Sequence, residues 1–164
     1  MADPARYYNA IAPSYDELHG EEQRAKHRAI RRHIAVGEED TILDVGHGSG
    51  IIASVFPAQS ILGIDIAERL LAQSPCRTMC VDFSELPLPF SDRSFDWVLC
   101  VTAFHHASDP EGLAHEFARI ARRGVAVSLL ARSPRLAEQR RALRLALSDV
   151  REERSGVDVL VWTT

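Results

Sequence analysis

The chain has 164 residues, of which 46% are hydrophobic, enough for one core of ordinary size and too few for a second domain. Its formal charge of −4 gives no reason to expect that the chain as a whole binds nucleic acid. We therefore expect a single domain over residues 1–164, with an N-terminal lid and first helix in 1–35 and a core sheet in 36–164.

The cysteines indicate an intracellular protein. Cys76, Cys80 and Cys100 are odd in number and do not form a disulfide framework, and two of them lie in apolar strand contexts. We expect buried thiols in a reducing compartment and no metal site. There is no signal peptide, and the longest apolar runs have the length of a strand, so the sequence predicts a soluble, cytoplasmic protein without a membrane span.

Helix and strand signals alternate along the chain, which is typical of an α/β fold with a parallel sheet. Ser108-Asp109-Pro110 supplies a helix start, Gly124 a helix end, and Ser155-Gly156 a tight turn between two final strands. The expected helices are 21–34, 50–56, 67–73, 110–122 and about 134–147, and the expected strands are 41–46, 60–65, 77–82, 94–101, 124–130, 148–154 and 157–163.

A glycine-rich loop follows the first strand and carries most of the functional information. Asp44 ends an apolar, β-branched run, and Gly46, Gly48 and Gly50 then allow a sharp turn and a close approach to a ligand. Residues 48–53 also satisfy the G-x-G-x-x-G/A dinucleotide fingerprint. Asp44 argues against a dinucleotide, because its carboxylate would repel the pyrophosphate, whereas it would favour a ligand that carries an ammonium and a sulfonium group.

A second acid follows at the expected distance. Asp65 ends the strand 60–65 and lies 19 residues after Gly46. A carboxylate there can accept hydrogen bonds from both hydroxyls of a ribose, as the acid about 20 residues beyond the glycines does in dinucleotide sites. Asp65 therefore supports a nucleoside cofactor without distinguishing between the two classes.

Together, the D-x-G-x-G-x-G pattern from Asp44 to Gly50 and the segment 82–99 resemble class I S-adenosylmethionine-dependent methyltransferases of the methyltransferase type 11, or UbiE-like, group. The resemblance implies a Rossmann-like, doubly wound sheet of seven strands, mostly parallel with an antiparallel C-terminal strand, and with helices on both faces. It also implies S-adenosylmethionine as cofactor, with S-adenosylhomocysteine as product. Cofactor contacts would come from Asp44, Gly46, His47, Gly48, Gly50, Asp65, Ile66, Asp82 and Phe83.

Within that resemblance, individual roles differ. Asp82 would accept from the adenine amino group with Phe83 beside the base, although Asp82 could instead cap an Asx-turn before Ser84. His47 stands where the family often has cysteine, and would either contact the methionine carboxylate or lie in solvent. Asp96, at the start of a strand, is expected to be structural.

The opening segment 3–16 resembles the family's Tyr-x-x-Ile-Ala-x-x-Tyr-Asp start, in which aromatic side chains close over the methionine end of the cofactor. Tyr8 and Tyr15 are the candidates, because an aromatic face near a sulfonium gains about 0.5–2 kcal/mol of cation–π attraction. The alternative is that Tyr7, Tyr8 and Tyr15 simply pack a helix onto the sheet.

Catalysis is less clearly marked, since methyl transfer from a sulfonium needs alignment more than a universal catalytic residue. The motif used for amide or exocyclic amine acceptors is absent after the strand 94–101. His105-His106 resembles the Leu-His-His of the UbiE-like group, and His106 is the candidate general base, with a structural histidine as the alternative.

Three functions stay open. The first is an S-adenosylmethionine-dependent methyltransferase (EC 2.1.1.-) that acts on a small molecule, alone or as a homodimer. The second is the catalytic subunit of a tRNA- or protein-modifying complex that needs a small zinc-binding activator protein, which would bind beside the strand 77–82. The third is a non-catalytic S-adenosylmethionine-binding module. A dehydrogenase is a distant fourth, on the charge argument above.

Overall fold

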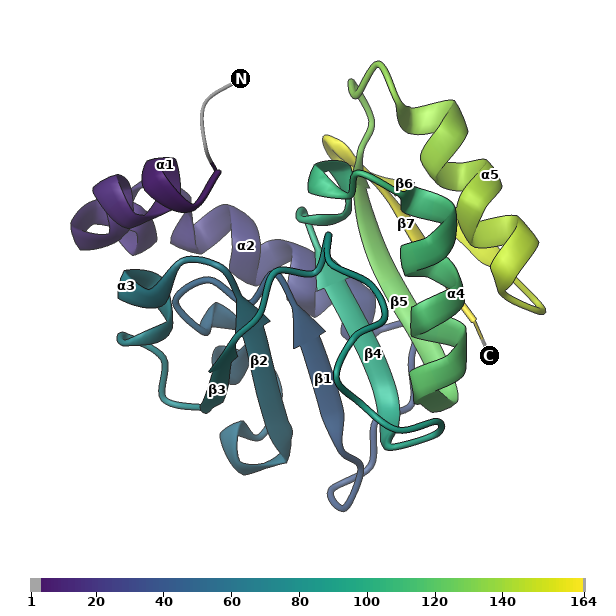
Figure 1. Ribbon diagram of the computed structural model, residues 1–164, viewed down its shortest axis with the longest axis horizontal. Helices are drawn as coiled ribbons and strands as arrows, with labels where there is room; N and C mark the ends of the chain where they lie inside the picture. The colour runs from purple at the N-terminus through teal and green to yellow at the C-terminus, as the bar shows by residue number, and fades with distance from the viewer. Residues whose placement is uncertain (1–3, 164) are drawn as a thin grey trace.

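The computed structural model describes residues 4–163, so residues 1–3 of the expected lid and residue 164 lie outside it. Its centre is a seven-stranded sheet in the order β3-β2-β1-β4-β5-β7-β6 (Figure 1). The strands are β1 (Ile42–Val45), β2 (Ile61–Asp65), β3 (Arg77–Cys80), β4 (Phe95–Val101), β5 (Ala121–Leu130), β6 (Arg151–Ser155) and β7 (Asp158–Trp162). The pairings among β1 to β5 are parallel, and β7 lies antiparallel between β5 and β6.

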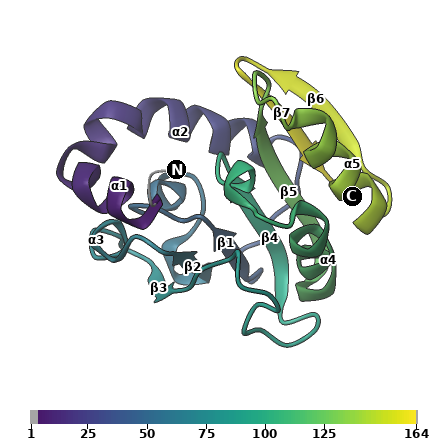
Figure 2. The same ribbon diagram turned by 45° about the horizontal axis from the view of Figure 1, so that its top comes forward.

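Helices cover both faces of this sheet, as Figures 1 and 2 show. They are α1 (Pro4–Ile11), α2 (Tyr15–Arg31), α3 (Glu68–Leu71), α4 (Pro110–Ile120) and α5 (Leu136–Ala146), joined by short 3-10 helices at Ala12–Ser14, Ile51–Ser54, Ala58–Ser60 and Phe104–His106. The predicted doubly wound α/β fold with an antiparallel C-terminal strand is confirmed.

The alternation of side chains in β4 shows why the sheet has two cores. Val98 and Cys100 face the cluster that contains Leu113 and Phe117 of α4, whereas Leu99 faces the cluster that contains Ile30 of α2. Successive strand residues point to opposite faces, so a continuous apolar strand must be covered on both sides. This explains why β4 is apolar without interruption from Trp97 to Val101.

Several predicted boundaries are wrong. The predicted helix 50–56 is a 3-10 helix at Ile51–Ser54, because residues 46–60 leave little room for a longer helix and Pro57 cannot continue it. The predicted helix 67–73 is reduced to the four residues of α3, and α2 begins at Tyr15 instead of residue 21. The strand expected over 148–154 begins only at Arg151.

Gly124 does not end a helix. It lies inside β5, which begins directly after α4, and a Cβ atom at this position would lie 2.5 Å from the Trp97 ring. The glycine therefore serves a close approach between β4 and β5.

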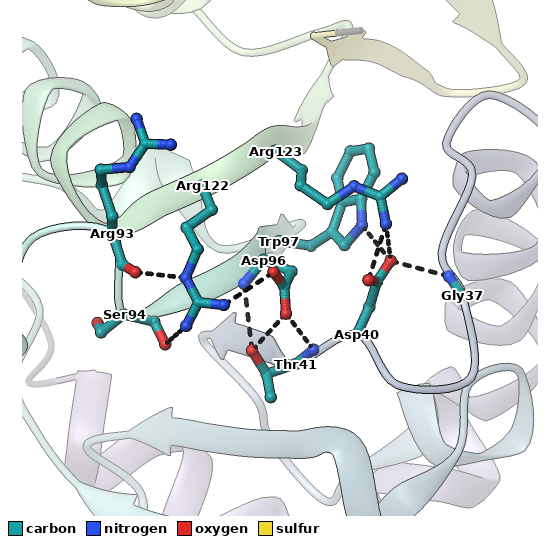
Figure 3. Close-up of polar contacts among 9 residues, drawn as sticks. All are labelled: Gly37, Asp40, Thr41, Arg93, Ser94, Asp96, Trp97, Arg122 and Arg123. Carbon is teal, nitrogen blue, oxygen red and sulfur yellow. Dashed lines mark hydrogen bonds and ion pairs between the residues drawn. The ribbon is translucent and has the colours of Figure 1, made fainter.

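The amino ends of β1, β4 and β5 are tied together by charged side chains (Figure 3). Asp40 accepts hydrogen bonds from the Gly37 N–H (2.8 Å) and Trp97 Nε1 (3.0 Å), and Arg123 Nη1 lies 2.7 Å from its Oδ1. Asp96, which pairs with Arg122 beside this group, is structural as expected, because its Oδ2 accepts from Thr41. These contacts at the amino ends of the strands therefore stabilise the fold, and a ligand site is expected at the carboxyl ends.

The cysteine expectation is only partly right. Cys100 is buried, but Cys76 is half-buried and Cys80 is exposed on the edge strand β3. Within residues 4–163 there is no helix long and apolar enough to span a membrane.

Candidate active site

A cavity lies at the carboxyl ends of β1, β2 and β4, where α1 and the start of α2 cover the edge of the sheet (Figure 1). We call it the main cavity. It gathers most of the residues predicted from the sequence, namely Tyr8, Tyr15, Gly46, Gly48, Asp65, Ile66, Asp82, Phe83 and His106. Ligands of open α/β sheets bind at this edge, next to the point where the strand order reverses, and here β1 is that point.

The glycine loop is held close to the cavity by backbone bonds to β2. The N–H groups of Gly46 and His47 both donate to the Ile64 carbonyl oxygen, at 2.9 and 3.0 Å. Gly46 has φ of 76°, and a Cβ atom there would lie 2.2 Å from the Cβ of Ala103. Any larger residue would displace the loop after β4, so this glycine keeps the floor of the main cavity open.

Asp65 is fixed in place by the backbone around it. Its Oδ2 accepts from the Gly48 N–H at 2.8 Å, and its Oδ1 accepts from the Ala67 N–H at 2.9 Å. A carboxylate has about four lone-pair positions, so two bonds leave capacity for two more donors. The geometry therefore fits a ligand that presents a pair of hydroxyl groups.

Asp82 makes the Asx-turn considered for it. Its Oδ1 accepts from the N–H (2.9 Å) and the hydroxyl (2.6 Å) of Ser84, which makes an Asx-turn. The residue also lines the main cavity beside the buried Phe83. The turn orients the carboxylate, and the apolar ring next to it suits a flat base that carries an amino group.

Aromatic side chains from the N-terminal segment close the other side of the main cavity. The rings of Tyr8 and Tyr15 meet edge to face with centroids 6.3 Å apart. The Tyr8 hydroxyl lies 3.0 Å from His106 Nε2, so it connects α1 to the loop after β4. Tyr7 is 52% exposed and does not line the cavity, which leaves it the packing role considered for it.

Burial sets the protonation states of the histidine and tyrosine side chains in and beside the main cavity. Desolvation lowers the pKa of His106 below its ordinary 6.5, with Asp65 opposing the shift, and lowers the pKa of His105 to about 4. Burial likewise raises the pKa values of Tyr8 and Tyr15. Near neutral pH the main cavity therefore holds the neutral imidazole of His106, which can accept a proton, and the protonated phenols of Tyr8 and Tyr15, which can donate hydrogen bonds.

Comparison with known proteins identifies the family. The model of the methyltransferase domain family matches residues 43–129, which are more than half of the chain. The match includes the glycine loop, Asp65, Asp82 and His106. The chain belongs to this methyltransferase family. Its cofactor is S-adenosylmethionine, which the glycine loop, the two acids and the aromatic rings of the main cavity fit.

Relatives and solved structures agree with this assignment. A demethylmenaquinone methyltransferase of Tropheryma whipplei (strain Twist) is 28% identical over 136 residues, which are 75% of this chain and 56% of that protein. A SAM-dependent methyltransferase of Thermotoga maritima, a possible histamine N-methyltransferase, has a TM-score of 0.77 at 16% identity and covers 98% of both chains. A second similar structure is a Haloferax volcanii complex between the Trm112 methyltransferase activator and a methyltransferase. Its TM-score is 0.74 at 21% identity, and the match covers 94% of this chain and 79% of that chain.

The solved structures and the curated relatives support different conclusions about this chain. At such identities, the likeness to solved structures establishes the fold of the methyltransferase. The chain spans about half the length of the curated relatives it matches.

The remaining predicted residues lie behind the main cavity of the methyltransferase. His47 turns its buried ring away from it, with Nδ1 2.8 Å from Asp44 Oδ2 and Nε2 2.7 Å from Ser74 Oγ. Burial alone would lower the pKa of His47, but the Asp44 carboxylate outweighs it and raises the pKa to about 9. Asp44 and His47 line a second, smaller cavity, and Gly50 lines neither.

An ionic network around the buried Lys26, beneath the methyltransferase site, was not predicted from the sequence. Lys26 is 7% exposed, donates to Thr102 Oγ1 at 3.0 Å, and pairs with Glu22 (2.6 Å) and Asp158 (3.2 Å). Ser128 also donates to Asp158. Thr102 lines the main cavity with φ of 56°, so the network holds a strained residue at the site. The available signal was that Lys26 is the one lysine of the chain.

Proposed function

We propose that this methyltransferase transfers a methyl group from S-adenosylmethionine to a small-molecule acceptor. The observation that carries the proposal is the composition of the main cavity, which combines two carboxylates and an apolar ring with a neutral histidine held by a tyrosine. The two carboxylates and the apolar ring suit an adenosine. The histidine and the tyrosine suit an acceptor that must lose a proton. A covering helix, α1, favours an acceptor small enough to enter beneath it.

On this proposal, Asp65 binds the two ribose hydroxyls and Asp82 accepts from the adenine amino group, with Phe83 and Ile66 beside the base. Gly46 and Gly48 let the backbone approach the ligand. Tyr8 and Tyr15 supply aromatic rings and protonated phenols at the methionine end, which also exclude water from the reacting groups.

When bound, S-adenosylmethionine supplies an electrophilic methyl group on a sulfonium. The chain has then to align the acceptor and take its proton. His106 is the candidate base, because a neutral imidazole has one unprotonated nitrogen, which can accept the proton as the new bond to the methyl group forms. The Tyr8 hydroxyl at 3.0 Å orients that ring. The rest of the rate enhancement comes from aligning donor and acceptor and from excluding water.

The acceptor class can be tested with labelled cofactor. The chain is incubated with methyl-labelled S-adenosylmethionine and fractions of host lysate, and label is followed into small metabolites, RNA and protein. We expect label in the small-metabolite fraction. Label in RNA or protein would contradict the small-molecule acceptor, and binding of cofactor without label anywhere would favour a non-catalytic binding module.

The cofactor contacts can be tested separately by calorimetry. Asp65→Ala should weaken S-adenosylhomocysteine binding about 10-fold to 100-fold, because hydrogen bonds to a charged group contribute about 1.5–3 kcal/mol. Glu39→Ala is the matched control, since it removes an exposed carboxylate just before β1, away from the main cavity. Equal affinity of the Asp65→Ala variant and the wild type would remove Asp65 from the site.

A second candidate is the catalytic subunit of a complex with a small activator protein. It is favoured by the edge strand β3, whose residues 77–80 are all exposed, and by the fold shared with the methyltransferase of the Trm112 complex. An exposed edge strand can pair with another chain. On this proposal the purified chain is inactive until a small zinc-binding activator of the host is added. Full activity of the chain alone would exclude it.

A further inference from the structure

A second cavity lies behind the glycine loop, and we call it the inner cavity. It is bounded by α2, the end of β1 and the 3-10 helix Ile51–Ser54, and its volume is about 20 Å³, enough for one water-sized group. Tyr15, Gly46 and Val101 line both the inner and the main cavity. The inner cavity is therefore adjacent to the place where the cofactor is proposed to bind.

His27 projects from α2 into the inner cavity and is 5% exposed. Its Nδ1 lies 2.8 Å from the Gln23 carbonyl oxygen, which can only accept, so Nδ1 carries a proton. Burial lowers the pKa of His27, and the ring is therefore neutral near pH 7 with Nε2 as a bare acceptor. Nε2 is buried without a hydrogen-bond partner among the described residues.

A buried acceptor without a donor is rare in folded proteins and calls for a ligand or a water molecule. Asp44 lines the same cavity, and its carboxylate can accept more than the one hydrogen bond from His47. Two acceptors that face one water-sized space suit a group with several N–H donors, and a positive charge on that group is favoured because His47, which also lines this cavity, offsets only part of the charge of Asp44. Among residues 4–163 no cluster of three or more His, Cys, Asp or Glu could hold a metal ion.

We propose that the inner cavity receives the α-ammonium group of the amino-acid end of S-adenosylmethionine, and that His27 Nε2 accepts one of its hydrogen bonds. His27 is then a specificity-determining residue, which selects nucleosides that carry this group. Figure 2 shows why α2 can contribute it, since the helix runs from α1 toward the carboxyl end of β4. The inference rests on the cofactor site proposed above.

The test compares ligands that differ at the amino-acid end. Calorimetry is performed with S-adenosylhomocysteine, with its analogue in which hydrogen replaces the α-amino group, and with 5′-methylthioadenosine, which lacks the whole amino-acid end. In wild-type protein we expect the analogue without the amino group to bind about 10-fold to 100-fold more weakly than S-adenosylhomocysteine. Equal affinity of the two would overturn the inference without any variant.

Variants then assign the effect to His27. In His27→Leu, which has similar size and no acceptor, the two ligands should bind with nearly equal affinity, whereas His27→Gln keeps an acceptor and should keep most of the difference. His115→Leu removes an exposed imidazole on α4 and should change nothing. The affinity for 5′-methylthioadenosine should stay constant across all variants, which shows that the adenosine end of the site is intact.

The outcomes separate this inference from the proposed function. If wild-type protein binds none of the three nucleosides, the cofactor site itself is wrong. If all three bind but His27→Leu preserves the full preference for the amino group, His27 does not bind that group and the inner cavity holds only water. A variant that does not fold leaves the wild-type ligand comparison to decide.

Discussion

At the residue scale, His47 and Gly63 show how closely the glycine loop packs on β2. A Cβ atom on Gly63 would lie 2.1 Å from Cγ of the His47 ring. The same ring is held by Asp44 and Ser74, so it has no room to move aside. The position of the loop therefore depends on a glycine in the neighbouring strand as well as on its own glycines.

This packing predicts a specific coupling between two substitutions. Gly63→Ala should lower the free energy of unfolding by about 1–3 kcal/mol, the usual cost of overpacking a core. In a His47→Ala background the same change should cost much less, because the ring that it collides with is gone. Urea denaturation of the wild type, both single variants and the double variant measures the coupling. Simple additivity would show that the two residues do not compete for space.

His106 offers a prediction about pH. Because burial lowers the pKa of His106 below the ordinary value of 6.5, the ring is neutral at pH 7 and becomes protonated only below pH 6.5. A general base works while it is unprotonated, so we expect the rate of methyl transfer to fall only as the pH drops below about 6.5. NMR titration of the His106 ring protons gives its pKa directly. A pKa above 6.5 would contradict both the burial argument and the role as a base at neutral pH.

At the scale of elements, the N-terminal segment and β4 differ in how they are held. Described residues 4–14 are attached through a few contacts to α3 and the loop after β4, such as Asn9 with Arg69 (2.9 Å) and Tyr8 with His106 (3.0 Å). β4 lies in the middle of the sheet with both faces covered. Local opening is expected where buried contacts are few.

We therefore propose that α1 is a lid that becomes ordered with cofactor. Hydrogen exchange in residues 4–16 should slow when S-adenosylhomocysteine is added, whereas exchange in β4 should be slow with or without it. The strand serves as the internal control. Equal protection of residues 4–16 in both states would show instead that Tyr8 and Tyr15 pack the helix permanently.

The charged cluster at the amino ends of the strands provides a stability prediction. Although burial raises the pKa of Asp40, hydrogen bonds from Gly37, Trp97 and Arg123 outweigh it and lower the pKa below 3.8. Asp40→Asn should lower the free energy of unfolding at pH 7 by about 1–3 kcal/mol. Because the folded-state pKa is lowered, this contribution is present above pH 3.8 and disappears as the pH falls through the folded-state value.

Asp92→Asn is the matched control for this cluster. Asp92 also pairs with an arginine, Arg119, but its side chain is 77% exposed, so the substitution should change the free energy of unfolding by less than about 1 kcal/mol. Chemical denaturation between pH 3 and pH 7 measures both variants. Equal effects of the two substitutions would show that the cluster in Figure 3 is an ordinary set of surface ion pairs.

At the scale of the whole molecule, the sequence predicted what depends on periodicity and spacing. Strand positions, the antiparallel end of the sheet, and the meeting of Gly46 with Asp65 and Asp82 all follow from local patterns and from the rule that parallel strands end at one edge. Contacts between distant segments were not predictable. Lys26 and Thr102 lie 76 positions apart, and the buried Nε2 of His27 depends on how α2 crosses the sheet.

The charge argument from Asp44 also needs the whole molecule. In isolation its carboxylate repels a pyrophosphate, but in the fold His47 pairs with it and, with a pKa of about 9, offsets part of its charge. The preference for a sulfonium nucleoside therefore depends on the assembled site, with Tyr8, Tyr15 and Asp65 as well as Asp44.

Calorimetry with wild-type protein tests this central claim most directly. S-adenosylmethionine and S-adenosylhomocysteine should each bind at one site per chain, and NAD should show no heat of binding under the same conditions. Saturation with S-adenosylhomocysteine should also raise the melting temperature, because a ligand that binds the folded state alone stabilises it. Tight binding of NAD without a response to either sulfur nucleoside would contradict the assignment of the main cavity to S-adenosylmethionine.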